Sequence, residues 1–137
     1  MDRRRSAGVL LLVAVGLHNL EEGLAYPLMR DQIAAALADL RLAWWSPSPA
    51  AFGLALTGLT LAVAAMIGWA ASGKRTSAKV WALRLTAMVL LANIVLPHLP
   101  AAIALGGYAP GVATALIVNL PLATWALIRL RASPQPE

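Results

Sequence analysis

The chain has 137 residues, of which 60% are hydrophobic and 12% are charged, and its mean hydropathy is +0.72. Soluble domains are about 45–50% apolar and about 25% charged. This composition therefore excludes an ordinary cytosolic enzyme, a disordered tail and a collagen-like fibre. The absence of cysteine excludes disulfides, cysteine-ligated metal centres and a thiol nucleophile. An integral membrane protein remains.

The positive charge indicates a membrane rather than a nucleic acid as the partner. The formal net charge is +5 and the isoelectric point is near 10.8. The basic residues flank long apolar runs, where they set the orientation of a membrane protein and contact lipid headgroups. Membrane lipids are therefore the expected partner, and no nucleic acid is expected.

Four apolar runs are long enough to cross a membrane, which takes about 20 residues in a helix. They lie at about 8–26, 50–72, 80–105 and 110–130. A backbone in lipid has to satisfy its own hydrogen bonds, and a helix does this within one segment. The sequence predicts an all-α, four-transmembrane-helix bundle that forms a single domain over residues 1–132, followed by a flexible tail at 133–137.

Basic residues predict the orientation of these four spans. With the N-terminus inside, only Arg30 and Arg41 lie outside. The other basic residues then lie on the cytoplasmic side, and they are Arg3, Arg4, Arg5, Lys74, Arg75, Lys79, Arg84, Arg129 and Arg131. This bias follows the positive-inside rule. It predicts that both termini are cytoplasmic, and the small size and lack of an organelle address favour a bacterial inner membrane.

The segment between the first two spans, about 28–49, has the pattern of an amphipathic helix. The apolar residues that recur at helical spacing are Ile33, Leu37, Leu40 and Trp44. We expect a short interfacial helix anchored by Trp44 and Trp45, which ends at the Ser-Pro-Ser-Pro sequence of residues 46–49. An ordered connecting loop is the alternative.

Polar residues inside the first span are the most informative feature. His18, Glu21 and Glu22 lie within it, and a charged side chain near the bilayer centre costs about 2.5–3.5 kcal/mol on insertion scales. The spacings of three and four residues place both carboxylates beside the histidine on one helical face. They need a counter-charge, protons or an aqueous pocket.

The third and fourth spans add polar groups at a similar depth. Pro97 and Pro100 flank His98, and each proline removes a helical hydrogen-bond donor, so we expect a kink there. A rise of 1.5 Å per residue places Glu21, Glu22 and His98 in the outer half of the bilayer. The fourth span begins outside at Tyr108, where Pro110 suits a helix start and Gly111 permits close approach.

These residues carry a resemblance to a known family. The motif His18-Asn19-Leu20-Glu21-Glu22, the later His98 and the sequence Tyr108-Ala109-Pro110-Gly111 occur in that order, and Asn93 precedes the second histidine. The chain resembles the HXXEE-domain family of small membrane proteins over about residues 18–130. The function of that family is not established, so the resemblance indicates which residues matter rather than what they do.

A metal site is the chemistry that these residue types favour. His18 and His98 would supply imidazole nitrogens and Glu21 or Glu22 a carboxylate, a set that suits catalytic zinc, with iron or manganese as alternatives. The remaining glutamate would act as general base or orient a histidine, and Tyr108 would donate to a developing oxyanion. Asn93 and Asn119 are further candidate pocket residues. A metal-dependent hydrolase of a lipid-like substrate is the favoured function.

Two other functions remain open from the sequence. Glutamate and histidine chains within membranes also form proton pathways, so the polar set would suit a metal-free relay in a transporter. Four spans with no inverted repeat make a poor transporter monomer, which would then be a homo-oligomer or part of a larger complex. Alternatively, the polar residues hold helices together in an interaction subunit.

Overall fold

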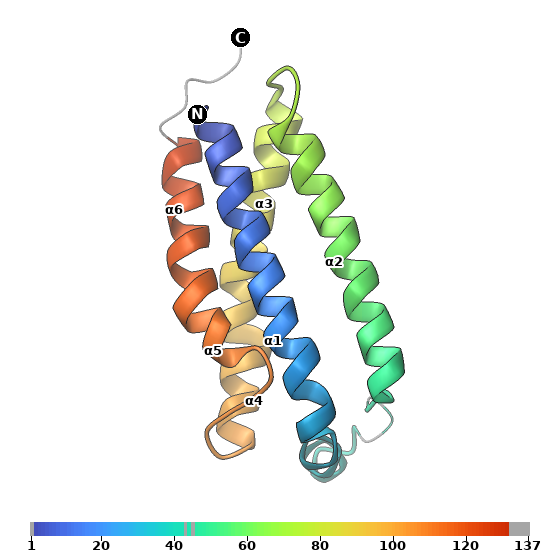
Figure 1. Cartoon of the computed structure of the whole chain (residues 1–137). Coiled ribbons are helices and arrows are strands. Elements are labelled where there is room, and N and C mark those ends of the chain that lie inside the picture. The colour runs from blue at the N-terminus through green and yellow to red at the C-terminus, as the bar shows by residue number, and fades with distance from the viewer. Residues whose placement is uncertain (1, 43, 45, 132–137) are drawn as a thin grey trace.

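The computed structural model describes residues 2–42, 44 and 46–131, and the secondary structure in that part of the chain is helical. Four helical segments are long and apolar enough to cross a membrane (Figure 1). They are α1 (Arg3–Asp39), α2 (Pro49–Ala71), α3 (Ser77–Asn93) continued by η2 (Ile94–His98) and α4 (Leu99–Ala104), and α5 (Val112–Thr114) continued by η3 (Ala115–Asn119) and α6 (Leu120–Arg131). The predicted all-α, four-span fold is confirmed. The tail predicted at 133–137 lies outside the described residues.

Side-chain caps fix where two of the helices begin. The hydroxyl of Ser48 accepts a hydrogen bond from the Ala51 backbone before α2, and that of Thr76 accepts one from Lys79 before α3. These hydroxyls satisfy backbone donors that the first helical turn leaves unpaired. The second span accordingly lies within one residue of its predicted bounds.

The first helix is longer than the sequence pattern predicted. It passes through Pro27 and continues to Asp39, so the amphipathic segment forms the last turns of α1 rather than a separate helix. A proline in a helix removes one hydrogen bond and bends the axis without having to end it. Figure 1 shows these turns, coloured cyan, nearly end-on, so they run across the direction of the bundle.

The main apolar core fills the half of the bundle near the chain termini. Its buried residues are Ala7, Leu11, Ala14, Val15, Ile67, Ala70, Leu83, Ala87, Leu90, Ala123, Ala126 and Leu130. Many of these are alanines, and small residues let membrane helices approach closely. The polar residues of the candidate site lie toward the other end, beyond this packed core.

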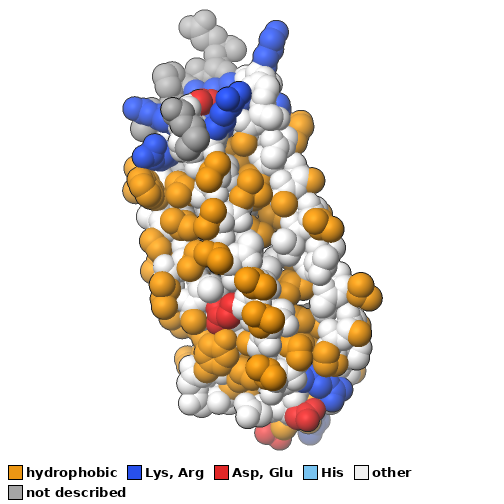
Figure 2. All heavy atoms as spheres, in the orientation of Figure 1, with side chains coloured by type: hydrophobic (Ala, Val, Ile, Leu, Met, Phe, Trp, Pro, Cys, Tyr) orange, Lys and Arg blue, Asp and Glu red, His pale blue; other side chains and the backbone are white. Residues whose placement is uncertain are grey.

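Basic side chains gather at the end where the N-terminus lies (Figure 2). Buried Arg4 lies at this end and donates hydrogen bonds to the Gly73 and Lys74 carbonyls, at 2.6 and 3.2 Å. These bonds tie the start of α1 to the turn between α2 and α3. The clustering is what the positive-inside argument requires, and the cytoplasmic location of this end remains a prediction.

Two π-helical turns, η2 and η3, interrupt the third and fourth spans. In η2 the Leu99 amide donates to the Ile94 carbonyl, and in η3 the Leu120 amide donates to the Ala115 carbonyl, both five residues back. Pro97 lies within η2, and Pro121 lies two residues after the end of η3. A proline has no backbone N–H, so each π turn lies where one helical hydrogen-bond donor is missing. The kink expected around His98 takes the form of a π turn, an irregularity frequent at functional sites.

Candidate metal centre

His18 from α1 and His98 from η2 meet inside the bundle. Their exposed fractions are 2% and 4%. The two Nε2 atoms lie 3.1 Å apart, and the rings meet edge to face at 85°. Histidines separated by 80 positions in the sequence therefore direct the same ring atom toward one point.

Asn93 lies against both imidazoles. Its Nδ2 atom is 3.0 Å from Nε2 of His18 and 3.0 Å from Nε2 of His98. A side-chain amide carries two hydrogens, so one Asn93 donates to both rings when both Nε2 atoms are acceptors. The π turn explains this contact, because it places residues five apart on one face of the helix.

Hydrogen bonds on the outer side of His18 fix which ring nitrogen carries its hydrogen. Nδ1 of His18 lies 3.1 Å from the Thr114 hydroxyl, and that hydroxyl donates its single hydrogen to Oε2 of Glu21. The hydroxyl is therefore the acceptor toward His18, so Nδ1 of His18 is the donor. The lone pair of His18 is left on Nε2, which faces His98.

The chain before α5 holds the other side of the histidine pair. The ring of His98 is hydrogen-bonded to the Pro110 carbonyl, and its Nε2 faces His18, so Nδ1 is the nitrogen available to donate. A Cβ on Gly111 would lie 2.6 Å from Cε1 of His98 and 2.9 Å from Cε1 of His18. Gly111 also has a φ of +84°, so both its backbone and its lack of a side chain are required here.

Glu22 completes a group of three candidate ligands. Its Oε2 is 3.9 Å from Nε2 of His18, and one ligand atom from each of His18, Glu22 and His98 lies within 4.8 Å of the others. Two imidazoles and one carboxylate are a ligand set of catalytic zinc sites. Among the described residues, these are the three that the structure brings together.

Glu21 faces a different partner from its neighbour Glu22. Oε1 accepts from the Tyr108 hydroxyl at 2.7 Å and from the Ala113 amide at 3.3 Å, and Oε2 accepts from the amide and hydroxyl of Thr114. Four donors fill the acceptor positions of a carboxylate. Glu21 thereby anchors the start of α5 to α1 and orients His18 through Thr114.

Tyr108 lies in the loop between the third and fourth spans. Burial raises its pKa to about 12, and its hydrogen bond and proximity to Glu21 act in the same direction. The phenol therefore stays protonated and donates to the carboxylate over the whole neutral range. It lies beside Glu21, one residue from the candidate ligand Glu22.

Asn119 lies at the other end of η3 from Thr114, at an exposed fraction of 0%. Neither its amide nitrogen nor its amide oxygen has a hydrogen-bond partner among the described residues. The structure does not bring it into the group formed by the two histidines and Glu22.

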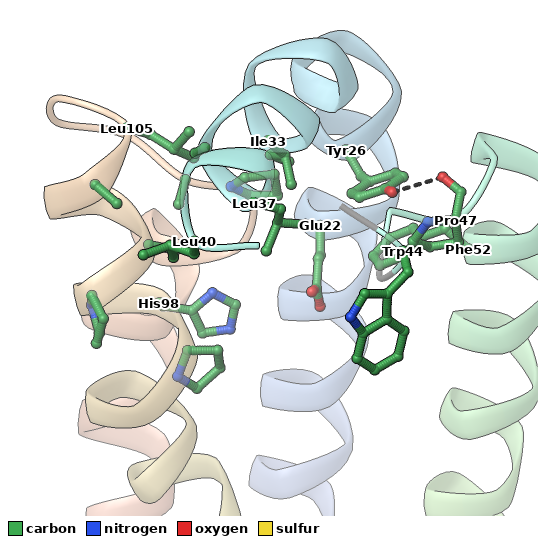
Figure 3. A pocket seen from close by; sticks show the side chains of 17 residues that line it. Glu22, Tyr26, Ile33, Leu37, Leu40, Trp44, Pro47, Phe52, His98 and Leu105 are labelled. Atoms are coloured by element: carbon green, nitrogen blue, oxygen red, sulfur yellow. Dashed lines mark hydrogen bonds between the residues drawn. The ribbon is translucent and has the colours of Figure 1, made fainter. Parts of the chain in front are cut away.

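A large apolar cavity of about 720 Å³ reaches Glu22 and His98 (Figure 3). Ile33 and Leu37 from the last turns of α1, and Leu40 directly after α1, lie over it. The remaining lining residues come from helices and connecting segments in the half of the bundle away from the termini, and they are Tyr26, Ala36, Trp44, Pro47, Phe52, Pro97, Pro100, Ala101, Ala104, Leu105, Ala109 and Pro110. The cavity size is typical of small-molecule sites, which span about 300–1,000 Å³. We call it the large chamber.

A second cavity of about 300 Å³ lies between α1, α2 and α3. It is lined by Asn19, Glu22, Phe52, Ala55, Leu56, Leu59 and Asn93. Glu22 and Phe52 border both cavities. We call this one the small chamber, and its wall carries three side chains with amide or carboxyl groups.

Thr114 is the site residue that the sequence argument missed. A threonine in an apolar helix is common, and its hydroxyl usually bonds the carbonyl of the preceding turn. Its position three residues after Gly111, at the start of the fourth span, is the only local signal. Its contact with His18 depends on how α5 packs against α1, which no spacing within the fourth span reveals.

A comparison with protein families identifies the chain. The family model described as a protein of unknown function with an HXXEE motif matches residues 9–126. Searches of curated proteins and of solved structures found no match. The matched residues include both histidines, both glutamates and the Tyr108–Gly111 sequence, and they span most of the chain. The chain therefore belongs to the HXXEE family.

Proposed function

We propose that the protein is a metal-dependent membrane enzyme that hydrolyses a lipid-like substrate, with zinc bound by His18, His98 and Glu22. The observation that carries the proposal is the pair of Nε2 atoms 3.1 Å apart. Zinc bound at about 2.0–2.1 Å in a tetrahedron separates its nitrogen ligands by about 3.3 Å. The spacing of the two imidazoles therefore supports their assignment as ligands of one ion.

The hydrogen bonds around the imidazoles support the same assignment. Metal-bound histidines usually donate their second ring nitrogen to a carboxylate, a carbonyl or water, which fixes the ring and the tautomer. Here the Thr114 hydroxyl accepts from His18 and donates in turn to Glu21, and the Pro110 carbonyl accepts from His98. Glu22 has to approach by about 1 Å, within the reach of a flexible side chain, and Asn93 has to turn its amide away.

Three protein ligands leave one position of a tetrahedral ion for water, as in catalytic zinc sites. Zinc held by these residues would make a bound water nucleophilic at neutral pH. In hydrolysis, the water oxygen would bond to the carbonyl carbon of an ester or amide, the bond to the leaving group would break, and the leaving group would take up a proton that the water gives up. The large chamber supplies the apolar binding surface beside this reaction.

Metal content of the detergent-purified protein tests the ligand set. We expect about one zinc per chain after supplementation, lost in His18→Ala and in His98→Ala and strongly reduced in Glu22→Gln. Asn19→Ala is the control, because Asn19 borders the small chamber but is not one of the three ligands. Only trace metal in the folded wild-type protein would contradict the proposal.

Hydrolysis requires its own test. The zinc-loaded protein should release product from long-chain esters or amides, a chelator should abolish the reaction, and added zinc should restore it. If the protein retains zinc but cleaves none of these substrates, the hydrolytic part of the proposal is wrong and the metal site stands alone.

One observation favours a second function, a proton relay without metal. Hydrogen bonds connect His18 to Thr114, Thr114 to Glu21, and Glu21 to the exposed loop residue Tyr108. Glutamate and histidine chains of this kind carry protons across membranes. This function predicts pH-driven proton flux into liposomes that Glu21→Gln abolishes, in protein stripped of metal.

A further inference from the structure

The wall of the large chamber is almost entirely apolar. Among its lining residues, polar side-chain atoms come from Glu22, His98, Tyr26 and the Trp44 indole. The Tyr26 hydroxyl is already used, since it donates to the Pro47 carbonyl at 2.8 Å (Figure 3). The rest of the wall is aliphatic, aromatic or proline. A ligand of this chamber therefore has a long apolar part and few polar atoms.

The described walls of the two chambers offer no basic side chain to an anionic head group. Among the described residues that line the two chambers, none is a lysine or an arginine, and Glu22, which borders both, would offset part of the charge of a bound zinc ion. Burying a phosphate or a carboxylate without a cation is expensive. In protein stripped of metal, phospholipids and fatty-acid anions therefore fit the chambers poorly, whereas an uncharged head group needs only hydrogen bonds.

The polar groups lie together at the boundary between the two chambers. Glu22 borders both, His98 borders the large chamber, and Asn19 and Asn93 border the small one. A ligand with its chain beneath Ile33, Leu37 and Leu40 thus brings its head group to Glu22, beside hydrogen-bonding side chains on the small-chamber side (Figure 3). The arrangement therefore fits a ligand that has one polar end and one apolar end.

We infer that the substrate is an uncharged amphiphile, with its hydrocarbon chain in the large chamber and its ester or amide head group at Glu22 and His98. This inference rests on the proposed function, because it names the substrate class of the same site. Chain binding in the large chamber uses apolar contact, so it is measurable in protein stripped of metal. Its outcome is therefore separate from that of the zinc measurement.

Trp44 provides the probe, because it lines the large chamber. We would replace Trp45, Trp69, Trp81 and Trp125 with phenylalanine, so that Trp44 remains. Two probes, a bromine-labelled long-chain alcohol and a bromine-labelled fatty acid of equal chain length, would then be added in the presence of a chelator, and quenching of the Trp44 fluorescence would be measured. We expect saturable quenching by the alcohol and at least about tenfold weaker binding of the fatty acid of equal chain length at pH 8. Equal binding of the two probes, or quenching that rises without saturation, would overturn the inference.

Two adjacent alanines supply a matched pair of variants. Ala36 lines the large chamber, whereas its neighbour Ala35 is exposed and does not. Ala36→Phe should fill the chamber and weaken alcohol binding by at least about tenfold, and Ala35→Phe should leave it unchanged. Equal affinities in both variants would show that the probe binds elsewhere. The head-group comparison in the parent protein decides the matter if Ala36→Phe fails to fold.

Discussion

At the scale of single residues, the candidate site depends on which atoms lie next to the two imidazoles. His18 and His98 point their Nε2 atoms inward because partners on their other side hold the rings. Gly111 lies against both rings, closer than any residue with a side chain is able to. The backbone around Gly111 therefore takes part in forming the site, although it supplies no ligand.

Gly111→Ala should disrupt the site by steric overlap. The new Cβ would lie 2.6 Å from His98 and 2.9 Å from His18, at a φ of +84°. We expect a loss of about 1–3 kcal/mol in the free energy of unfolding, as in other overpacked interiors, together with loss of bound zinc. Thermal unfolding and metal analysis measure the two effects.

Gly106→Ala is the matched control for that substitution. Gly106 has a similar φ, +79°, but a Cβ added there would meet nothing within 4 Å. The Gly106→Ala protein should lose about 1–2 kcal/mol of its free energy of unfolding, because alanine is strained in a left-handed backbone, and it should keep its zinc. Equal zinc loss in both variants would show that the contact with the histidines is not the cause.

The raised pKa of Tyr108 predicts that the stability of the folded protein depends on pH in the alkaline range. Its pKa is raised to about 12 in the folded protein, so folding favours the protonated phenol. Its contribution to stability is complete below the unfolded value of about 10 and is lost as the pH rises from there through about 12. Wild-type protein should therefore lose more stability than Tyr108→Phe over that range.

Unfolding of both proteins between pH 8 and pH 12 provides the measurement, and tyrosinate absorbance gives the midpoint of the titration. Comparing the two proteins cancels the titration of groups that they share. Identical pH profiles would mean that the hydrogen bond from Tyr108 to Glu21 contributes nothing to the folded state.

At the scale of elements, the π turn η2 brings Asn93 beside His98. In a regular α-helix, residues five apart lie about 140° apart around the axis, so these side chains would diverge. In η2 the Asn93 amide lies 3.0 Å from the His98 ring. The irregularity at Pro97 is thus a structural requirement of the site.

Pro97→Ala restores a backbone donor and should favour a regular α-helix at this point. We expect stability to be kept or raised, while zinc affinity falls by about 10–100-fold because the shell around His98 is misplaced. Zinc titration and thermal unfolding of the same samples measure both. Pro100→Ala is the control, since Pro100 lies in the same span but in α4, outside the π turn. Unchanged zinc affinity in Pro97→Ala would show that zinc binding does not depend on the π turn.

The sequence predicted which segments are spanning helices better than it predicted where those helices bend or form π turns. Runs of about 20 apolar residues indicate spanning helices almost directly, because lipid permits few alternatives. The bend of α1 after Pro27 and the two π turns were not specified, since a proline permits a bend, a break or a π turn with similar local cost. Packing between helices makes that choice.

At the scale of the whole molecule, the site joins three of the four spans. His18 and Glu22 come from α1, Asn93 and His98 from the third span, and Thr114 from the fourth. The sequence identified the candidate ligands because ionisable groups are rare in lipid. It did not separate the two glutamates, because both project beside His18. The fold distinguishes them: Glu21 meets the fourth span, whereas Glu22 faces the histidine pair.

The packed core and the candidate site occupy different halves of the bundle. The packed core lies near the termini, and the large chamber lies at the opposite end under the last turns of α1. The candidate ligands Glu22 and His98 border the hollow half, beyond the packed core, as the proposed function on a lipid-like substrate requires.

X-ray absorption of the zinc-loaded protein tests most directly whether the two imidazoles share one ion. We expect a first shell of nitrogen and oxygen at about 2.0–2.1 Å that contains two imidazoles, with one fewer in any zinc that His98→Ala retains. A wild-type spectrum with a single imidazole, or with oxygen ligands alone, would contradict a metal centre built from His18 and His98.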